Sequence, residues 1–313
     1  MKKVLVIAGP TASGKTELSL SVAAELGGEI VSADSMQIYR GMDIGTAKAT
    51  PEEQAVIPHH MIDVVDPSED YSVSRYVDDA AACCEDILSR GKLPVITGGT
   101  GLYIDSLLSG RNFEAGNDPD LRLALNEKYT AIGGEAMLRE LSDFDPDRAA
   151  ILHPSDMKRI VRAFEVYLLS GETITEHDRR TKELPPRYDA LFIIPGFSDR
   201  QLLYDRINSR VDRMFEEGLV DEVRNLLNAG VPDTCTAMQA IGYKETVGLL
   251  RGELTPEETS EQIKLASRRY AKRQITWFAR RKDALRLNRD EFSSSRELTV
   301  SALRAAKEFI DDK

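Results

Sequence analysis

The segment Gly9–Thr16 constrains the fold of this chain more than any other feature of its sequence. It reads Gly-Pro-Thr-Ala-Ser-Gly-Lys-Thr and fits the pattern G-x-x-x-x-G-K-S/T. The apolar run Val4–Ala8 precedes it, as expected of a strand buried on both faces, and the helical pattern Glu17–Leu26 follows it. In this context the glycines let backbone N–H groups turn inward around phosphate oxygens, at the positive end of the helix dipole. The sequence therefore predicts a phosphate-binding loop at the mouth of an α/β core.

Two side chains of this loop carry chemistry of their own. Lys15 would neutralise phosphate charge, and the hydroxyl of Thr16 is a candidate ligand for Mg²⁺. We interpret the loop as a cradle for a diphosphate, although the same pattern also serves proteins that bind ATP. The candidate diphosphate-binding residues are Gly9, Pro10, Thr11, Ala12, Ser13, Gly14, Lys15 and Thr16.

Further apolar runs alternate with helical patterns along the chain. Short strands are expected at Glu29–Ala33, Leu93–Thr97, Ala190–Ile194 and Ala284–Leu287, and a long helix is expected at Ser72–Arg90. This alternation indicates an α/β fold in which helices flank a parallel sheet and ligands bind at the carboxyl ends of the strands.

One long segment interrupts the alternation. From residue 113 to residue 185 the chain has helical patterns at Asp118–Tyr129, Gly134–Leu141 and Asp156–Leu169 and no convincing strand. We therefore expect an all-helical insert domain. The expected division is a first part of the core at 1–112, the insert at 113–188 and a second part of the core at 189–313.

The charge of the chain is distributed unevenly, which bears on its partners. Taken over the whole chain, the formal net charge of −11 argues against binding to nucleic acid. However, the window from Lys264 to Arg289 holds ten Lys or Arg and one acidic residue, so it carries +9 and the remainder carries −20. Because each phosphate contact is local, such a window can bind a polyanion on an acidic protein.

Within this basic window, three side chains recur at helical spacing. Arg269, Arg273 and Trp277 would place two guanidinium groups and an indole on one face, which suits phosphates and stacked bases. A solvated helix face is the alternative interpretation. Lys158, Arg159 and Arg162 form a second, smaller basic group in the expected insert.

Neither a membrane span nor a disulfide framework is expected. No apolar run approaches the roughly 18 residues of a spanning helix. The apolar stretch at the N-terminus is short and runs directly into the phosphate loop, so we interpret it as a strand rather than a signal peptide. Three cysteines, with Cys83 and Cys84 adjacent, fit a reducing compartment. We expect a cytoplasmic protein without membrane contact and take a monomer as the working hypothesis.

The remaining candidates follow two of the expected strands. Asp34 ends the second strand beside the phosphate loop, where a carboxylate can take a proton from an attacking group, or can simply cap a turn. Thr100 follows the third strand within Gly98–Tyr103, whose glycines allow a ligand to approach closely or merely form a tight turn. His59 and His60 have no cysteine nearby and are expected to be structural rather than zinc ligands.

Taken together, these segments resemble a known family. The chain is similar to the bacterial tRNA dimethylallyltransferases, also called tRNA isopentenyltransferases or the IPP transferase family, from residue 9 to residue 282. Ile38 and Met61 are conservative departures from the residues usual in that family. The motifs that carry the resemblance are Gly9–Thr16, Asp34–Tyr39, Asp43–Lys48, Pro58–Asp63, Thr97–Tyr103 and Met238–Lys244.

The resemblance implies a fold and an activity. The implied fold is a P-loop kinase-like core that carries a helical insert. The implied reaction transfers the dimethylallyl group of dimethylallyl diphosphate to the exocyclic N6 amine of the adenine 3′-adjacent to the anticodon, with Mg²⁺ present and without ATP hydrolysis. The partners would be this co-substrate and the anticodon stem-loop of tRNA.

The resemblance also implies roles for individual residues. Asp34 would be the general base, and Thr100 and Lys15 complete the catalytic candidates. Arg206 or Arg210 would meet the diphosphate, and the sequence does not decide between them. The candidate tRNA-binding residues are Asp34, Ser35, Met36, Gln37, Thr100, Arg122, Lys158, Arg159, Arg162, Gln239, Gly242, Tyr243, Lys244, Arg269, Arg273 and Trp277.

Two other classes of function share part of this pattern. A P-loop kinase for a small molecule or nucleoside would have the loop, the aspartate and the glycine-rich turn, but it leaves the basic window and Gln239–Tyr243 unexplained. A nucleotide-binding RNA partner without catalysis leaves the carboxylate at the phosphate site unexplained. Detection of a prenylated nucleoside, rather than phosphate transfer from ATP, discriminates between these classes.

Overall fold

The computed structural model describes residues 1–110, 118–183 and 185–312, and the chain divides into two compact units. One unit comprises Met1–Leu108 and Arg187–Lys313, and the other comprises Ser109–Pro186. The boundary expected between residues 112 and 113 lies outside the described residues.

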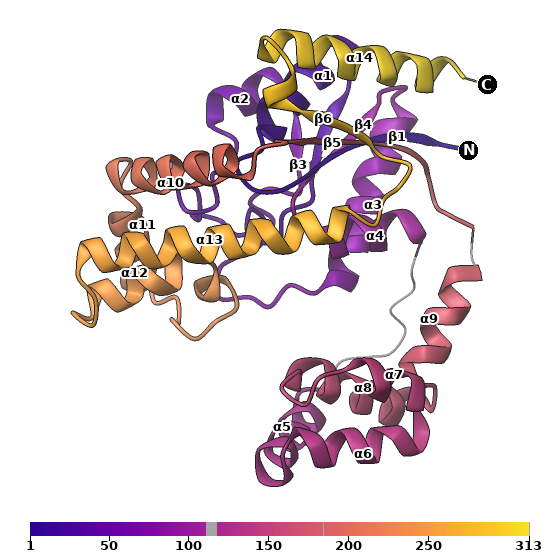
Figure 1. Ribbon diagram of the computed structural model, residues 1–313, viewed down its shortest axis with the longest axis vertical. Helices are drawn as coiled ribbons and strands as arrows, with labels where there is room; N and C mark the ends of the chain where they lie inside the picture. The colour runs from indigo at the N-terminus through magenta and orange to yellow at the C-terminus, as the bar shows by residue number, and fades with distance from the viewer. Residues whose placement is uncertain (111–117, 184, 313) are drawn as a thin grey trace. The chain divides into compact units, whose positions relative to one another are not determined.

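A six-stranded parallel sheet forms the centre of the first unit (Figure 1). The strand order is β3-β2-β4-β1-β5-β6, so β1 lies between strands that come much later in the chain. The loops after β1 and β4 therefore meet at one edge of the sheet, which is where parallel α/β sheets bind ligands. The strands are β1 (Lys3–Ala8), β2 (Glu29–Ser32), β3 (His59–His60), β4 (Pro94–Gly98), β5 (Asp189–Gly196) and β6 (Leu285–Asn288).

Helices pack against the two faces of this sheet. On one face α1 and α14 bury apolar side chains against those that the strands direct toward them, such as Leu5, Ile30 and Val95. On the other face Tyr76 of α3 stacks on Tyr103 of α4 at 4.0 Å between ring centroids. The helices of this unit are α1 (Lys15–Leu26), α2 (Pro51–Val56), α3 (Val73–Ser89), α4 (Gly101–Ser109), α10 (Arg200–Glu216), α11 (Leu219–Asn228), α12 (Tyr243–Leu250), α13 (Pro256–Phe278) and α14 (Ser295–Asp311), with single 3₁₀ turns at η1 (Ala237–Gln239) and η2 (Arg289–Glu291).

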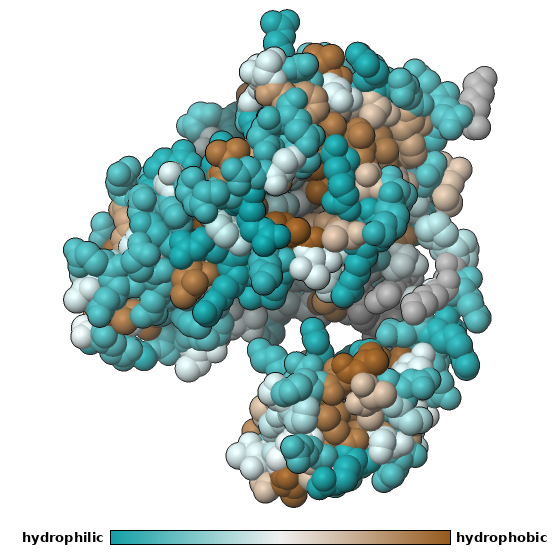
Figure 2. Space-filling model, viewed as in Figure 1, coloured by the Kyte–Doolittle hydropathy of each residue, from teal (hydrophilic) through white to brown (hydrophobic). Residues whose placement is uncertain are grey.

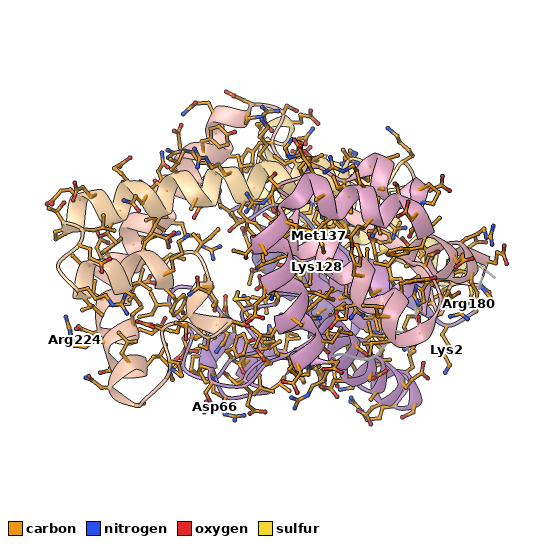
Figure 3. The ribbon with its side chains drawn as sticks, turned by 90° about the horizontal axis from the view of Figure 1, so that it is seen from below. Lys2, Asp66, Lys128, Met137, Arg180 and Arg224 are labelled. Carbon is orange, nitrogen blue, oxygen red and sulfur yellow. The ribbon has the colours of Figure 1, made fainter. Side chains whose placement is uncertain are left out.

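The second unit is a small helical bundle. Met137 of α6, which is labelled together with Lys128 of α5 in Figure 3, is fully buried in a core that it shares with Leu141 and Ile160. Phe144 stacks on Tyr167 at 4.2 Å between ring centroids. The helices of this unit are α5 (Pro119–Ile132), α6 (Gly134–Phe144), α7 (Pro146–Ile151), α8 (Met157–Ser170) and α9 (Ile174–Glu183).

The fold class predicted from the sequence, an α/β protein with a parallel sheet flanked by helices, is confirmed. The short elements α2 and β3 are absent from the sequence-based expectation, because six and two residues are too few to show a hydrophobic period. None of the described helices is both long and apolar enough to cross a membrane.

One buried carboxylate ties β2 to its neighbours. Glu29 is 2% exposed, and its two oxygens accept hydrogen bonds from Arg90, Lys92 and His60. The bond from Arg90 holds the pKa of this carboxyl far below its usual range, with Lys92 and His60 acting in the same direction and burial opposing them. His60, one of the two histidines noted in the sequence, therefore has a structural role in the sheet. The ring of His59 forms a hydrogen bond with the carbonyl of Ile57.

We expect Glu29→Gln to lower the free energy of unfolding by about 1.5–3 kcal/mol at pH 7, because hydrogen bonds between charged groups contribute about this much. A depressed folded-state pKa means that the contribution of Glu29 is fully present above its unfolded value of about 4.3 and declines as the pH falls toward the folded value. The difference between the two proteins should therefore narrow from pH 5 toward pH 2, as urea unfolding can measure.

The matched control for this prediction is Asp86→Asn, which removes an exposed partner of the same Arg90. It should cost about 1 kcal/mol or less, as exposed ion pairs do. Equal stability of Glu29→Gln and the unchanged protein at pH 7 would contradict this account of the buried carboxylate.

Candidate active site

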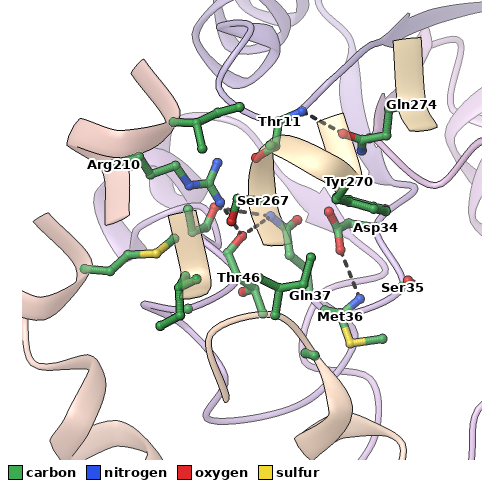
Figure 4. Close-up of a pocket in the computed structure, with 18 of the residues that line it drawn as sticks. Thr11, Asp34, Ser35, Met36, Gln37, Thr46, Arg210, Ser267, Tyr270 and Gln274 are labelled. Carbon is green, nitrogen blue, oxygen red and sulfur yellow. Dashed lines mark hydrogen bonds between the residues drawn. The ribbon is translucent and has the colours of Figure 1, made fainter. Parts of the chain in front are cut away.

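A pocket of about 430 Å³ opens at the carboxyl edge of the sheet in the first unit. The loops that follow β1 and β2 and the carboxyl end of β4 line it, together with residues of α10, α13 and η1 (Figure 4). It brings together many of the residues singled out in the sequence. Those that line it are Thr11, Lys15, Thr16, Asp34, Ser35, Met36, Gln37, Gln239 and Arg273.

The phosphate loop has the backbone that its glycines predict. Gly14 caps α1 with a φ of 87°, and a Cβ there would lie 2.1 Å from the guanidinium of Arg289. Ala12 also has a positive φ, of 62°, and its carbonyl accepts a hydrogen bond of 3.0 Å from Nε of Arg206. The hydroxyl of Ser13 is fully buried and has no hydrogen-bond partner among the described residues. Arg206 thus holds the loop from outside and Gln274 bonds to the N–H of Thr11, while the hydroxyl of Ser13 is left for a ligand.

Three cations, Lys15, Arg210 and Arg273, and the carboxylate of Asp34 line the pocket. Burial lowers the pKa of Lys15 to about 8, and the nearby charge of Arg210 adds to this effect while Asp34 opposes it. Arg210 lines the pocket and donates a 3.3 Å hydrogen bond to the carbonyl of Thr46, and burial lowers its pKa too. An anion bound in the pocket would stabilise the charged forms of Lys15 and Arg210. Between the two arginines left open by the sequence, Arg210 faces the pocket and Arg206 braces the loop at Ala12.

The strand-end residues Asp34 and Thr100 are brought together. Oδ1 of Asp34 accepts a 3.0 Å hydrogen bond from the backbone N–H of Met36, which fixes the turn after β2. Oγ1 of Thr100 accepts from the backbone N–H of Ser35 at 3.1 Å and donates to its hydroxyl at 3.3 Å. Thr100 therefore braces the segment that carries Asp34 rather than standing apart from it.

Gln37 shapes the pocket wall. Its Oε1 accepts from the hydroxyl of Ser32 at 3.0 Å, and its Nε2 donates to the carbonyls of Thr46 and Ala47 at 3.3 and 3.2 Å. Both ends of the amide are thus bonded within the protein. The wall that it supports is held from behind by Glu222, whose oxygens accept hydrogen bonds from the backbone N–H groups of residues 43, 44 and 45.

The segment from Gln239 to Lys244 divides into exposed and buried residues. Gln239 and Lys244 are exposed, and Gln239 lines the pocket. Tyr243 has no exposed surface, and its hydroxyl donates to Glu222 at 2.6 Å. Gly242 is buried at the start of α12, with a φ of 98°. The structure thus places Tyr243 and Gly242 behind the pocket wall and leaves Gln239 and Lys244 accessible.

The basic helix α13 also presents two kinds of side chain. Arg269 and Arg273 are exposed, on a part of the molecule where Figure 2 shows a mostly hydrophilic surface over α10 to α13. Trp277 is half-buried: its Nε1 donates to Asp105 at 2.8 Å, and a Cβ on Gly101 would lie 2.3 Å from its ring. The indole predicted to stack on bases is therefore pinned to α4 in this structure.

Sequence reasoning missed two residues of α13 that face the pocket, Tyr270 and Gln274. Burial, followed by the charge of Asp34, raises the pKa of Tyr270 to about 12, so its hydroxyl keeps its proton. Gln274 is 5% exposed and contacts the phosphate loop. The buried positions Ile263, Ala271 and Phe278 share their face, and this helical period was the signal that could have identified both residues.

Two arginines of the second unit share one buried carboxylate. Arg122 and Arg162 each donate to Oε2 of the fully buried Glu165 at 2.7 Å. Lys158 and Arg159 are exposed on α8. The basic group noted in the sequence therefore consists of two arginines fixed by an anion and two cations in contact with solvent.

The residues present suit a divalent cation only in combination with a bound anion. No group of three or more His, Cys, Asp or Glu side chains with metal-binding geometry occurs among the residues at 1–110, 118–183 and 185–312. Thr16, Asp34 and Thr97 do line the same pocket, and the hydroxyl of Thr97 has no protein partner within the described chain. This donor set is compatible with Mg²⁺, which usually keeps several waters and binds through one or two protein groups and substrate phosphates.

Known proteins resemble this chain along most of its length. Residues 37–282 match the family model described as IPP transferase, and residues 2–61 match one described as isopentenyl transferase. The chain is 48% identical over 278 residues to a tRNA dimethylallyltransferase of a Thermoanaerobacter species, covering 88% of each chain. It is 46% identical over 300 residues to the tRNA dimethylallyltransferase of Acetivibrio thermocellus, covering 95% of each.

Solved structures agree with this similarity. A full-length tRNA isopentenylpyrophosphate transferase from Bacillus halodurans superposes with a TM-score of 0.74 at 40% identity, covering 99% of this chain and 98% of that one. A eukaryotic dimethylallyltransferase acting on tRNA superposes with a TM-score of 0.80 at 30% identity, covering 98% of this chain and 80% of that one.

The lowered pKa of Lys15 leads to a prediction about anion binding. The protonated amine attracts an anion, so the affinity for inorganic diphosphate should be highest below pH 8 and should weaken as the pH rises through about 8. Calorimetric titration between pH 6.5 and 9.5 measures this change. Lys15→Arg, whose guanidinium stays charged throughout this range, should show only the change that comes from the ionisation of diphosphate itself. Identical profiles for the two proteins would show that Lys15 does not govern anion binding.

Proposed function

Because the chain belongs to the IPP transferase family, we propose that it is a tRNA dimethylallyltransferase that uses dimethylallyl diphosphate. The proposed acceptor is the exocyclic N6 amine of the adenine 3′-adjacent to the anticodon, and the second product is diphosphate. The observation that carries this proposal is a pocket in which half-buried cations, a carboxylate and an apolar wall meet. The apolar part of the lining comprises Ile207, Val211, Met214 and Ile263.

This lining favours prenyl transfer over the kinase alternative. A kinase site must place a second polar substrate beside the phosphate loop, whereas this pocket offers the apolar side chains of α10 and α13 next to Lys15 and Arg210. A hydrocarbon group attached to a diphosphate matches both parts, because apolar surface gains free energy by leaving water and the diphosphate meets charge. The relatives named for tRNA dimethylallyl transfer support the same choice.

The phosphate loop and its cations would stabilise the leaving group. An aromatic amine is a weak nucleophile, so the bond from the allylic carbon to the diphosphate oxygen must break readily. Negative charge would grow on the diphosphate as this bond breaks, and we propose that loop N–H groups stabilise it together with Lys15 and Arg210, which line the pocket. Mg²⁺, held by Thr16 and the diphosphate oxygens, would supply further positive charge.

Asp34 is the proposed general base for the amine. Its carboxylate lies in the same pocket as the phosphate loop, and the bond from Met36 holds the turn that presents it. Removal of the amine proton as the new C–N bond forms typically contributes about 10²–10⁴-fold in rate. The adenine must leave its stack to reach this position, because an enzyme cannot attack a base within a stacked loop. Ser35, Met36 and Thr100 are the proposed surroundings of the extruded base.

The tRNA would bind through exposed basic and polar side chains on both units. In the first unit these are Gln239, Lys244, Arg269 and Arg273, all exposed. In the second unit they are Lys158 and Arg159, with Arg122 and Arg162 arranged by Glu165. Gly242, Tyr243 and Trp277 are buried or half-buried, so we propose that they support this surface rather than contact RNA.

The purified protein with dimethylallyl diphosphate, Mg²⁺ and a tRNA that carries the target adenine should yield a prenylated nucleoside, detectable by mass spectrometry. Asp34→Asn keeps the Oδ1 acceptor for Met36 but removes the base, so turnover should fall by about 10²–10⁴-fold. Binding of tRNA should stay within about twofold of the unchanged protein, since the substitution removes no cation that could meet a phosphate. Phosphate transfer from ATP without any prenylated nucleoside would overturn the proposed function, and equal losses of binding and rate would overturn the role of Asp34.

The two exposed arginines of α13 give a separate prediction. The double substitution Arg269→Gln and Arg273→Gln should weaken tRNA binding and lower the slope of its salt dependence by about one for each phosphate that these arginines neutralise. Filter binding at several salt concentrations measures this slope. The matched control, Arg304→Gln with Lys307→Gln, removes the same charge from exposed positions of α14 and should leave the slope unchanged. Identical slopes for the two double variants would show that α13 is only a solvated face.

A further inference from the structure

A single buried amide joins the phosphate loop to the turn that carries Thr100. Oε1 of Gln274 accepts a 2.9 Å hydrogen bond from the backbone N–H of Thr11, and its Nε2 donates a 3.0 Å hydrogen bond to the carbonyl of Gly99 (Figure 4 shows the first). The residue is 5% exposed and lies on α13, 175 residues along the chain from Gly99. Both polar ends of the side chain are thus bonded to backbone groups of two different loops.

The chemistry of the partners fixes the orientation of this amide. The N–H of Thr11 can only donate and the carbonyl of Gly99 can only accept, so one end of the side chain must be oxygen and the other nitrogen. A Cβ on Gly99 would lie 2.1 Å from Nε2 of Gln274, which shows how closely the amide approaches the backbone there. Of the common side chains, a neutral primary amide of this length meets both requirements.

The sheet topology makes this bridge important. Strand β4 lies between β1 and β2, so the turn after β4 separates the phosphate loop from the segment that contains Asp34. On one side of that turn, Thr100 bonds to Ala33 through its backbone N–H and to Ser35 through its hydroxyl. On the other side, Gln274 bonds the neighbouring Gly99 to Thr11. A continuous set of hydrogen bonds therefore runs from the phosphate loop to the segment of the proposed catalytic carboxylate.

We propose that Gln274 is a positioning residue that couples the phosphate loop to the Thr100–Asp34 segment, so that the binding of one substrate strengthens the binding of the other. This inference rests on the proposed function for the identity of the two ligands, a diphosphate and an RNA. When an anion orders the loop, the N–H of Thr11 is held, and Gln274 passes that constraint through Gly99 to Thr100 and Ser35. Linkage is reciprocal, so RNA bound at the base site must tighten diphosphate binding by the same factor.

The test measures binding of inorganic diphosphate to the full chain, with and without an anticodon stem-loop RNA that carries the target adenine. In the unchanged protein the RNA should tighten diphosphate binding at least about fivefold, the lower end of typical couplings. Gln274→Met has a similar length but neither hydrogen bond, and it should reduce this factor to about one while each ligand alone binds within about threefold. Its prenyl transfer turnover should fall roughly 10²-fold, the cost of a misplacement near 1 Å.

Two further variants separate coupling from simple loss of stability. Gln262→Met makes the same substitution at an exposed position of α13 and should keep the full coupling factor. Gln274→Glu keeps the acceptor for Thr11 but faces a second acceptor at Gly99, so it should also lose coupling, and it decides the question if Gln274→Met does not fold. Coupling that survives in the folded Gln274 variants, or that is absent from the unchanged protein, would overturn the inference. Coupling without any prenylated nucleoside would instead overturn the proposed function alone.

Discussion

The close approach of β4 to its neighbours at their carboxyl ends is the constraint on which the site depends. A Cβ on Gly98 would lie 2.2 Å from the carbonyl of Ala33, so any other residue there would force β2 and β4 apart. The backbone N–H of Gly9 donates to the carbonyl of Gly98 on the other side. The strand order puts β4 between the phosphate loop and the Asp34 segment, and this glycine keeps the two segments close across it.

The pocket is then closed by long-range contacts that regular secondary structure does not supply. Glu222 of α11 accepts hydrogen bonds from three consecutive backbone N–H groups at residues 43 to 45, and from the hydroxyl of Tyr243. A Cβ on Gly45 would lie 2.4 Å from the ring of Tyr243, so this residue must be glycine too. The irregular segment that lines the pocket is thus held by a half-buried carboxylate and a buried phenol, and the phenol of Tyr243 is not accessible to RNA.

The elements that could be predicted from the sequence are those with a clear local pattern. The phosphate loop, the strands β1, β4 and β5 and the helix that begins after Ser72 all show a clear hydrophobic period or a cap, and the structure contains each of them. It did not predict β3, since two residues have no period, or the roles of Gln274 and Trp277, since their partners lie 175 and 172 residues away. Spacing suggested that Trp277 shares a face with Arg273, whereas the carboxylate of Asp105 and the space above Gly101 decide where the indole lies.

The charges of the pocket explain why the site favours an anion. Lys15 and Arg210 are both buried enough for desolvation to lower their pKa values, and the charge of Asp34 opposes this effect. With Arg273, three cations line the pocket against this one carboxylate, which leaves an excess of positive charge in a region of low dielectric, where Coulomb energies exceed those in water several-fold. A bound diphosphate would remove this imbalance and raise the pKa of Lys15, so anion binding and protonation would be linked. In the proposed reaction the same excess charge would stabilise the diphosphate as its bond to carbon breaks, because the cations are already in place and need no reorganisation.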